Sequence, residues 1–314
     1  MIKVSKFSIF SKSAIILYFF IATILLFFTT DVTAKTISYS DPISYTVTTY
    51  EASTSSLEYL PTEILEPDGS SSYFRYKAVE GMSPKPDPAP VATIETKTVA
   101  KASKYETKLY IIDSGIKGPV VMIIGGVHGN EPAGYMAAAK VKNYNLKKGK
   151  LLVLPEANKL AIEAGRRYAS GGSDLNRLFP QSKSASPKNI LAKDIYNIIK
   201  DNNVDWLMDM HEGFDYYKNT ATNSVGQTII YYPANNAIST VEDIVKHLNN
   251  DIPKSLHKFT ILRYPVQGSV ARSSAEFLGV KSFIFETSMK QTLATRISLQ
   301  EKAAQKLLSN LGML

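Results

Sequence analysis

The chain has 314 residues, of which 44% are hydrophobic and 20% charged, a globular composition that excludes wholesale disorder and fibrous repeats. It contains no cysteine, which excludes disulfides, thiolate metal ligands and a cysteine nucleophile, so a transition metal would need His, Asp or Glu. The net charge of +8 is dispersed along the sequence. That dispersal argues against a nucleic-acid partner and leaves association with anionic cell-wall polymers or a membrane surface open.

Residues 1–34 have the layout of an export signal. Lysines precede an uninterrupted apolar run at residues 14–28, and Ala34 follows it at a cleavage-like position. The competing interpretation is an uncleaved membrane anchor, because the run is close to the shortest length that spans a bilayer. Both interpretations predict that the remaining chain is exported, as a secreted or cell-envelope protein.

Residues 35–103 form a predicted N-terminal extension. This segment is rich in Ser, Thr and Tyr, which predicts short strands or extended chain. Within it, residues 81–90 carry prolines at alternate positions, which predicts a stiff linker, with an ordinary surface loop as the alternative. No motif in the extension carries recognisable chemistry.

Residues 104–314 alternate between apolar runs of strand length and amphipathic stretches of helical period. This alternation predicts an α/β domain with a mixed, largely parallel twisted sheet and helices on both faces. Ligands bind at the carboxyl ends of the strands in such sheets. The predicted strands are 108–113, 119–124, 151–154, 204–210, 227–232, 258–263 and 281–285, and the predicted helices are 132–141, 187–200, 239–249 and 292–311.

Two polar clusters at predicted strand ends contain candidate metal ligands. In the first, His128 and Glu131 lie three residues apart before a helix, a pair that suits zinc, although a capping Glu and a hydrogen-bonded His would give the same pattern. In the second, His211 ends a buried strand and could supply a third ligand, with Glu212 as the alternative ligand or base. Three protein ligands leave a position for water, as in catalytic zinc sites.

Two further clusters could serve a substrate. Arg166, Arg167 and the segment 173–180 bring arginines and an asparagine that could clamp a carboxylate, with ordinary surface charge pairs as the alternative. Glu286 directly follows an apolar strand, where burying an acid is costly unless it is paired or used. Beside a metal-bound water, such an acid would suit a general base.

Together, residues 125–132, 174–177, 208–212 and 283–287 resemble the zinc carboxypeptidase superfamily, in particular its succinylglutamate desuccinylase/aspartoacylase branch. The resemblance covers residues 107–290 and implies the zinc carboxypeptidase-like fold with one Zn²⁺ per chain. It implies a role for each polar residue of the clusters: His128, Glu131 and His211 ligate zinc, Asp174 orients His128, Asn176 and Arg177 hold a substrate carboxylate, Arg167 or its neighbour Arg166 polarises the scissile carbonyl, and Glu286 acts as general base and then general acid.

Two further matches concern specificity. Residues 263–269 resemble the carboxypeptidase loop with a mobile, substrate-closing tyrosine, here Tyr264. Residues 272–277 resemble the aspartoacylase segment whose arginine, here Arg272, binds an acidic substrate side chain. The alternative for Arg272 is a solvated arginine on a helix.

The sequence therefore predicts an extracytoplasmic zinc-dependent amide hydrolase that acts on a small peptide or N-acyl amino acid with a free carboxylate. The enzymes of the resembling branch carry a further C-terminal domain, whereas this sequence has a leader and an extension. That difference favours a metallocarboxypeptidase acting on peptides, including cell-wall stem peptides. The alternatives are an N-acyl amino acid deacylase and, in another class, a non-catalytic cell-surface binding protein.

Overall fold

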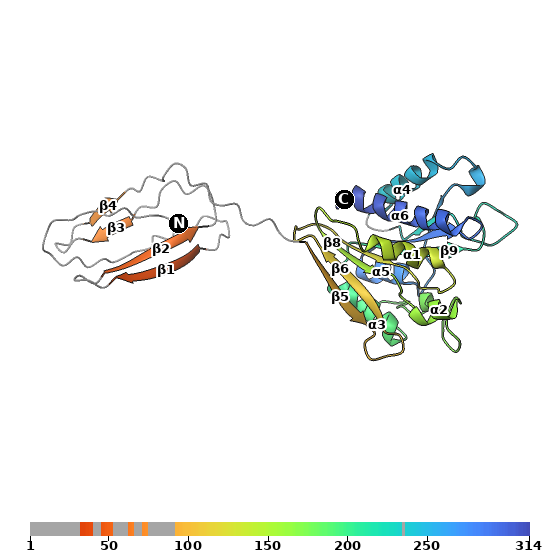
Figure 1. The fold of residues 1–314 in the computed structure, drawn as a ribbon, viewed down its shortest axis with the longest axis horizontal. Helices are drawn as coiled ribbons and strands as arrows, with labels where there is room; N and C mark the ends of the chain where they lie inside the picture. The colour runs from red at the N-terminus through yellow and green to blue at the C-terminus, as the bar shows by residue number, and fades with distance from the viewer. Residues whose placement is uncertain (1–31, 40–44, 53–61, 66–70, 75–91, 234–235) are drawn as a thin grey trace. The chain divides into compact units, whose positions relative to one another are not determined.

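The computed structural model describes residues 32–39, 45–52, 62–65, 71–74, 92–233 and 236–314 (Figure 1). The chain divides into two compact units, Met1–Ala89 and Pro90–Leu314. Among the described residues, no helix has the length and apolar character needed to cross a bilayer. The predicted apolar run of the leader and the proline-rich segment lie outside the described residues, so both stay predictions.

The described residues of the first unit form two antiparallel strand pairs. Strand β1 (Val32–Tyr39) pairs with β2 (Tyr45–Ala52), and β3 (Thr62–Leu65) pairs with β4 (Ser71–Phe74). This agrees with short strands in the extension. Strand β1 already begins within the last three residues of the predicted leader.

The second unit is built on one eight-stranded sheet with the order β11-β10-β12-β9-β7-β8-β6-β5. Neighbours β12, β9, β7 and β8 run parallel, whereas β10 is antiparallel to β12 and β6 is antiparallel to both β8 and β5. The predicted mixed, largely parallel sheet is confirmed. The strands are β5 (Thr93–Val99), β6 (Thr107–Asp113), β7 (Val120–Ile124), β8 (Lys150–Leu154), β9 (Trp206–Gly213), β10 (Thr228–Tyr231), β11 (Thr260–Arg263) and β12 (Lys281–Ser288).

Strand β5 shows that the main domain starts earlier than the sequence predicts. We expected the extension to continue to residue 103, but β5 pairs with β6 along its whole length and forms the edge of the main sheet. Most side chains of β5 are exposed, including that of Ile94. An edge strand without a buried face lacks the apolar pattern on which a strand prediction depends.

Helices cover both faces of the sheet, as predicted (Figure 1). Successive strand residues alternate between two buried clusters, so that Ile123 packs on the side of α1, α4 and α6, and Ile124 packs on the side of α3 and α5. The helices are α1 (Pro132–Val141), α2 (Lys159–Ala164), α3 (Ile190–Asp201), α4 (Ile238–Asn250), α5 (Val270–Leu278) and α6 (Leu293–Asn310).

The parallel strands β7, β9 and β12 bring distant polar residues to one edge of the sheet. The register aligns Glu286 of β12 with His211 of β9, and Asp209 of β9 with Ile124 at the end of β7. The loop that carries His128 leaves β7 at the same edge. The segments around His128, His211 and Glu286 therefore meet at the carboxyl ends of adjacent strands, although more than a hundred residues lie between the first and the last of them.

Candidate metal centre and active site

Glycines shape the turn that brings the first two candidate ligands to the sheet edge. Gly126 has φ +70°, a left-handed conformation that favours glycine. A Cβ on Gly129 would lie 1.9 Å from the carbonyl oxygen of Ala161, so only glycine lets this loop approach α2 so closely. The turn thereby places His128 before α1 and Glu131 at its N-cap position.

His128, Glu131 and His211 converge in a buried cluster. Glu131 Oε1 lies 2.7 Å from His128 Nδ1, and Glu131 Oε2 lies 2.8 Å from His211 Nδ1. The two Nδ1 atoms are 3.1 Å apart. One ligand atom from each residue lies within 4.8 Å of the others, so the three side chains can share one ion. This nitrogen and oxygen donor set suits zinc, and the predicted convergence is confirmed.

The carboxylates and imidazoles of the cluster shift one another's pKa values. Burial raises the pKa of Glu131, but His211 and His128 outweigh burial and bring its pKa down to about 2. Glu131 is therefore an ionised carboxylate between two imidazoles. Burial lowers the pKa of His211, yet Asp209 and Glu131 together raise it well above its usual value.

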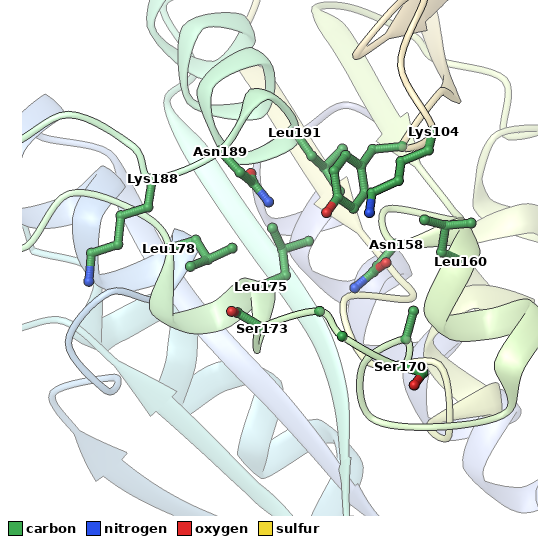
Figure 2. A pocket seen from close by; sticks show the side chains of 14 residues that line it. Lys104, Asn158, Leu160, Ser170, Ser173, Leu175, Leu178, Lys188, Asn189 and Leu191 are labelled. Carbon is green, nitrogen blue, oxygen red and sulfur yellow. The ribbon is translucent and has the colours of Figure 1, made fainter.

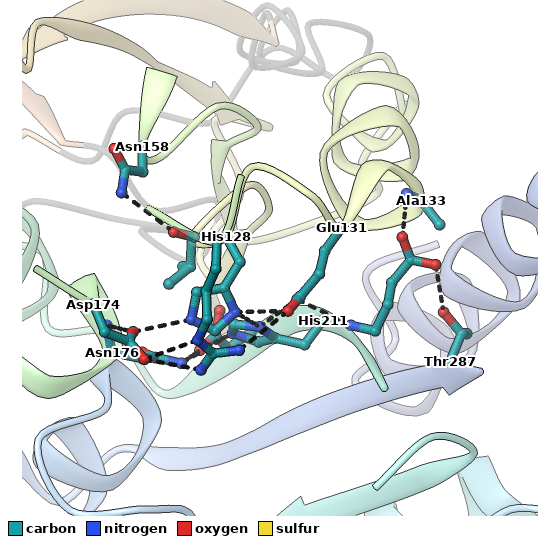
Figure 3. Close-up of polar contacts among 12 residues, drawn as sticks. His128, Glu131, Ala133, Asn158, Asp174, Asn176, His211 and Thr287 are labelled. Carbon is teal, nitrogen blue, oxygen red and sulfur yellow. Dashed lines mark hydrogen bonds and ion pairs between the residues drawn. The ribbon is translucent and has the colours of Figure 1, made fainter. Parts of the chain in front are cut away.

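A carboxylate holds each imidazole at its Nε2, and Figure 3 shows Asp174 in this place beside His128. Asp174 Oδ1 lies 3.0 Å from His128 Nε2, as predicted from the resemblance, and Asp209 Oδ2 lies 2.9 Å from His211 Nε2. A carboxylate on Nε2 fixes that proton and leaves Nδ1 free to bind an ion. Sequence reasoning missed Asp209, although an acid two residues before His211 in a buried strand points to the same side of the sheet.

Asn176 differs from the prediction that it holds a substrate carboxylate. Its side chain is buried, with the amide nitrogen 3.3 Å from Asp209 Oδ2 and 3.0 Å from His211 Nε2. Its amide oxygen accepts a hydrogen bond from Val270 N at 3.2 Å. In this arrangement Asn176 braces the His211–Asp209 pair, because both ends of its amide are used inside the protein. The side chain of the neighbouring Arg177 is 44% exposed, and its Nη1 donates to the carbonyl oxygen of Asn176 at 2.7 Å.

Arg167 takes the predicted place beside the ligands. Its Nη2 lies 2.9 Å from Asp174 Oδ2 and its Nη1 lies 3.7 Å from Glu131 Oε1, while 44% of the side chain is exposed. A guanidinium that is anchored on one side and open on the other can face a substrate carbonyl. For the neighbouring Arg166, the structure shows two backbone contacts: its carbonyl accepts from Gly129 N at 3.0 Å, and its N–H donates to the carbonyl oxygen of Ala161 at 3.1 Å. The geometry favours Arg167 over Arg166.

Glu286 is buried at the centre without a hydrogen-bond partner for one oxygen. The residue is 8% exposed, and its Oε2 is buried and unpaired among the described residues. Burial raises its pKa to about 8; Glu131 and Asp209 add to this shift, whereas His211 and Arg167 oppose it. An orphaned buried carboxylate oxygen is costly and calls for an ion or a water molecule. The residues at this position therefore fit a metal ion with a bound water.

Glu212, the alternative ligand or base, faces away from the cluster. Its Oε2 accepts a hydrogen bond from Ala133 N at 2.9 Å, and its Oε1 forms an ion pair with Arg296. Consecutive strand residues point to opposite faces, so His211 and Glu212 cannot both reach the ion. The structure thus selects His211.

Tyr264 and Arg272 lie together beside Tyr232. The Arg272 guanidinium is 4.9 Å from the ring centroid of Tyr232 and 5.3 Å from that of Tyr264. Tyr264 has φ 62° and is 56% exposed, as a movable side chain on a strained turn would be. Arg272 also pairs with Glu276 one helical turn later, with Nε 2.5 Å from Oε2. Arg272 is therefore held by neighbours rather than freely solvated.

A pocket separate from the ligand cluster lies beside the loop that carries Arg167 and Asp174 (Figure 2). It has a volume of about 190 Å³ and is lined by Lys104, Asn158, Ser173, Lys188 and others. None of the predicted site residues lines it.

Comparisons with known proteins confirm the resemblance over part of the chain. Residues 117–228 match the model of the succinylglutamate desuccinylase/aspartoacylase catalytic domain. The N-alpha-acetyl-L-2,4-diaminobutyric acid deacetylase of Halomonas elongata is 31% identical over 102 residues, which are 31% of this chain and 29% of that protein. The match thus spans less than a third of the relative's length.

Solved structures with a similar fold include a D,L-carboxypeptidase and an ectoine utilization protein. The mDAP-bound D,L-carboxypeptidase Csd4 of Helicobacter pylori has a TM-score of 0.56 at 20% identity, over 63% of this chain and 52% of that chain. The ectoine utilization protein EutE (DoeB) of Ruegeria pomeroyi has a TM-score of 0.54 at 15% identity, over 73% of this chain and 70% of that chain. At such identities these likenesses show the fold alone, and the predicted carboxypeptidase-like fold is confirmed.

Proposed function

We propose that this chain is a zinc-dependent amide hydrolase that acts outside the cytoplasm on a small peptide or N-acyl amino acid with a free carboxylate. The observation that carries the proposal is the buried His128–Glu131–His211 cluster with the unpaired oxygen of Glu286 beside it. A zinc ion held by these three ligands would acidify its bound water and polarise the scissile carbonyl. The matches to a deacetylase and to the desuccinylase/aspartoacylase domain support hydrolysis of an amide bond.

Glu286 is the general base of this proposal. Its raised pKa places it close to neutrality, where a carboxylate can accept a proton and later return it. Glu286 takes a proton from the attacking water as the new carbon–oxygen bond forms. It then gives that proton to the amine nitrogen as the carbon–nitrogen bond breaks, which leaves a carboxylic acid, ionised by loss of its proton to solvent, and a free amine as products.

Arg167 and Arg177 are the candidate residues for contacts with the carbonyl oxygen and the free carboxylate of the substrate. Arg167 is held at Asp174 and is open toward the centre, so it is placed to stabilise the negative charge that develops on the carbonyl oxygen. Arg177 is the candidate partner of the substrate's free carboxylate, because its guanidinium is half exposed and Asn176 is occupied elsewhere. Arg272 would contact an acidic side chain of the substrate.

Two substrate classes remain, and different observations favour each. The Csd4 structure contains mDAP and belongs to a D,L-carboxypeptidase, which supports a carboxypeptidase that acts on cell-wall peptides. The relative with matched sequence is a deacetylase of an N-acetylated amino acid, which supports a deacylase. A non-catalytic binding protein is the weakest alternative, since it would have no use for an unpaired Glu286 beside complete metal ligands.

The mechanism is tested by Glu286→Gln. This substitution keeps the side chain's size and removes its ability to accept a proton, so we expect zinc to be retained, as measured by elemental analysis, and hydrolysis to fall to background. Glu163→Gln on α2 is the matched control, because Glu163 is exposed and pairs only with Lys159 among the described residues. Undiminished hydrolysis by Glu286→Gln would refute the mechanism.

The substrate class is tested with a panel of amides. We expect cleavage of tripeptides that end in diaminopimelate if the protein is a carboxypeptidase, and cleavage of N-acetyl or N-succinyl amino acids if it is a deacylase. Metal content without cleavage of any member would favour the binding protein.

The exported location is tested through the leader. Expression of the full chain, followed by fractionation and N-terminal sequencing, should give a protein outside the cytoplasm that begins after Ala34. A membrane-bound protein that keeps its N-terminus would indicate the anchor instead, and a cytoplasmic protein would contradict export.

A further inference from the structure

A buried charge lies directly behind the candidate metal centre, on the side that the proposed chemistry does not use. Glu212 follows the ligand His211 in β9, and its side chain is fully buried on the opposite face of the strand. Burying an ion pair is costly, and apolar residues of similar size often stabilise a protein equally well. The presence of Glu212 at this position therefore requires a reason other than stability.

The hydrogen bonds of Glu212 and Glu131 cross between two elements. Glu212 Oε2 accepts from Ala133 N at 2.9 Å, at the start of α1 and two residues beyond the ligand Glu131. In the opposite direction, Glu131 Oε2 accepts from Glu212 N at 3.0 Å. Each glutamate thus binds the backbone of the other's element, which fixes the start of α1, and with it Glu131, against β9.

Helix α6 supports this arrangement from outside the sheet. Arg296 pairs with Glu212 Oε1, and Gln300 donates from Nε2 to the carbonyl oxygen of His211 at 2.8 Å. The two residues lie four apart on the same face of α6. Thr287 of β12 joins them, 3.5 Å from Glu212 Oε1 and 3.3 Å from Gln300 Nε2. In Figure 3, Ala133 and Thr287 lie at the side of Glu131 that is away from Asp174.

We propose that Glu212, Arg296 and Gln300 form a clamp that positions Glu131 and His211 and thereby sets the affinity of the centre for its metal. The inference rests on the metal centre of the proposed function. The clamp residues act through the ligands and touch neither ion nor substrate, so they are positioning residues. Groups that orient metal ligands typically change metal affinity 10- to 100-fold when they are removed.

The test is the zinc dissociation constant of the full chain, measured by competition with a chromophoric chelator. In Glu212→Leu combined with Arg296→Met, an apolar pair replaces the ion pair and Ala133 N loses its acceptor. We expect zinc to bind about 10- to 100-fold more weakly. Glu212→Gln combined with Arg296→Met restores an acceptor oxygen for Ala133 N, so we expect it to recover most of the affinity. A merely structural role would not predict this recovery.

Two single variants complete the test. Gln300→Leu leaves the ion pair intact and removes the bond to His211, and we expect weaker zinc binding and a shifted visible spectrum of the cobalt-substituted protein. Lys302→Met is the control, since Lys302 lies on the same helix but pairs with exposed Asp251. Lys302→Met should change neither the zinc affinity nor the visible spectrum of the cobalt-substituted protein.

The outcomes separate the clamp from the proposed function. Unchanged zinc affinity in both Gln300→Leu and the Leu/Met pair would overturn the clamp. If the Leu/Met pair fails to fold, the Gln/Met pair and Gln300→Leu decide, with unchanged affinity in both counting against the proposal. Absence of zinc binding by the unaltered chain would instead remove the metal centre itself.

Discussion

The metal centre and the outer rim of the site are held in different ways. His128 and His211 are almost fully buried, and each ring nitrogen faces a named partner. By contrast, Arg167 and Tyr264 on the rim are about half exposed and are held on one side only. Under the proposed function, the chemistry would therefore depend on a buried interior that is held from several sides, and recognition would depend on half-exposed side chains.

The largest expected effect comes from breaking the interior at a ligand. His128→Ala removes one of three ligands and leaves Glu131 and Asp174 without their shared partner. We expect loss of stoichiometric zinc and loss of hydrolysis, and the rise in melting temperature that zinc gives the unaltered chain should disappear. His247→Ala on α4 is a suitable control, because that residue lies outside the cluster. Full zinc content in His128→Ala would contradict the assigned ligand set.

Replacement of Arg167 should have the next largest effect. Arg167→Met keeps an unbranched apolar stem but removes the guanidinium and its charge, and removal of one such group typically lowers kcat about 100- to 1000-fold. Arg166→Met is the matched neighbour, and we expect little change from it. Steady-state kinetics of both variants decide between the two arginines, and an equal loss in both would contradict the choice of Arg167.

The support of His211 gives a smaller expected effect. Asp209→Asn removes the carboxylate on His211 Nε2 and should weaken zinc binding about 10- to 100-fold, as measured by chelator competition. Asp174→Asn should do the same to His128 and should also release Arg167, so its kcat should fall further than that of Asp209→Asn. Equal kcat losses would show that Arg167 does not depend on Asp174.

The smallest expected effect lies on the rim. Glu276→Gln weakens the ion pair that holds Arg272 and leaves the tyrosine rings in place. Because an exposed ion pair contributes only about 0.2–1 kcal/mol, we expect a change of a few-fold in KM for substrates with an acidic side chain. The KM for an analogue with a neutral side chain should not change. A change of kcat with constant KM would contradict this prediction, because it would show that Glu276 affects the catalytic step and not substrate binding.

The apolar pattern of the sequence predicts the strands that carry this site, but it does not predict the contacts between residues that are distant in the sequence. The apolar runs before residues 125, 211 and 286 predict three strands, and the structure confirms all three, although β9 continues to Gly213 and β12 to Ser288, beyond their predicted ends. Asp209 was missed because an acid in an apolar strand shows only that something pairs with it. Strand β5 was missed because an exposed edge strand carries no apolar period.

The sequence marks Asn176 and Glu212 as residues of the site, but it does not predict which residues they contact. Both lie within motifs that mark the site, yet Asn176 is used to brace His211, and Glu212 faces α6. Their partners lie tens of residues away in the sequence, and only the register between strands decides which of them is met.

The sequence by itself determined the donor types, their order along the chain and their positions at strand ends, because composition and residue periodicity are local properties. The tertiary structure decided which face of β9 carries a candidate metal ligand, which arginine adjoins the cluster of ligands and which helix supports that cluster from behind. Those choices depend on strand register and helix packing, where a shift of one residue exchanges the two faces of a strand.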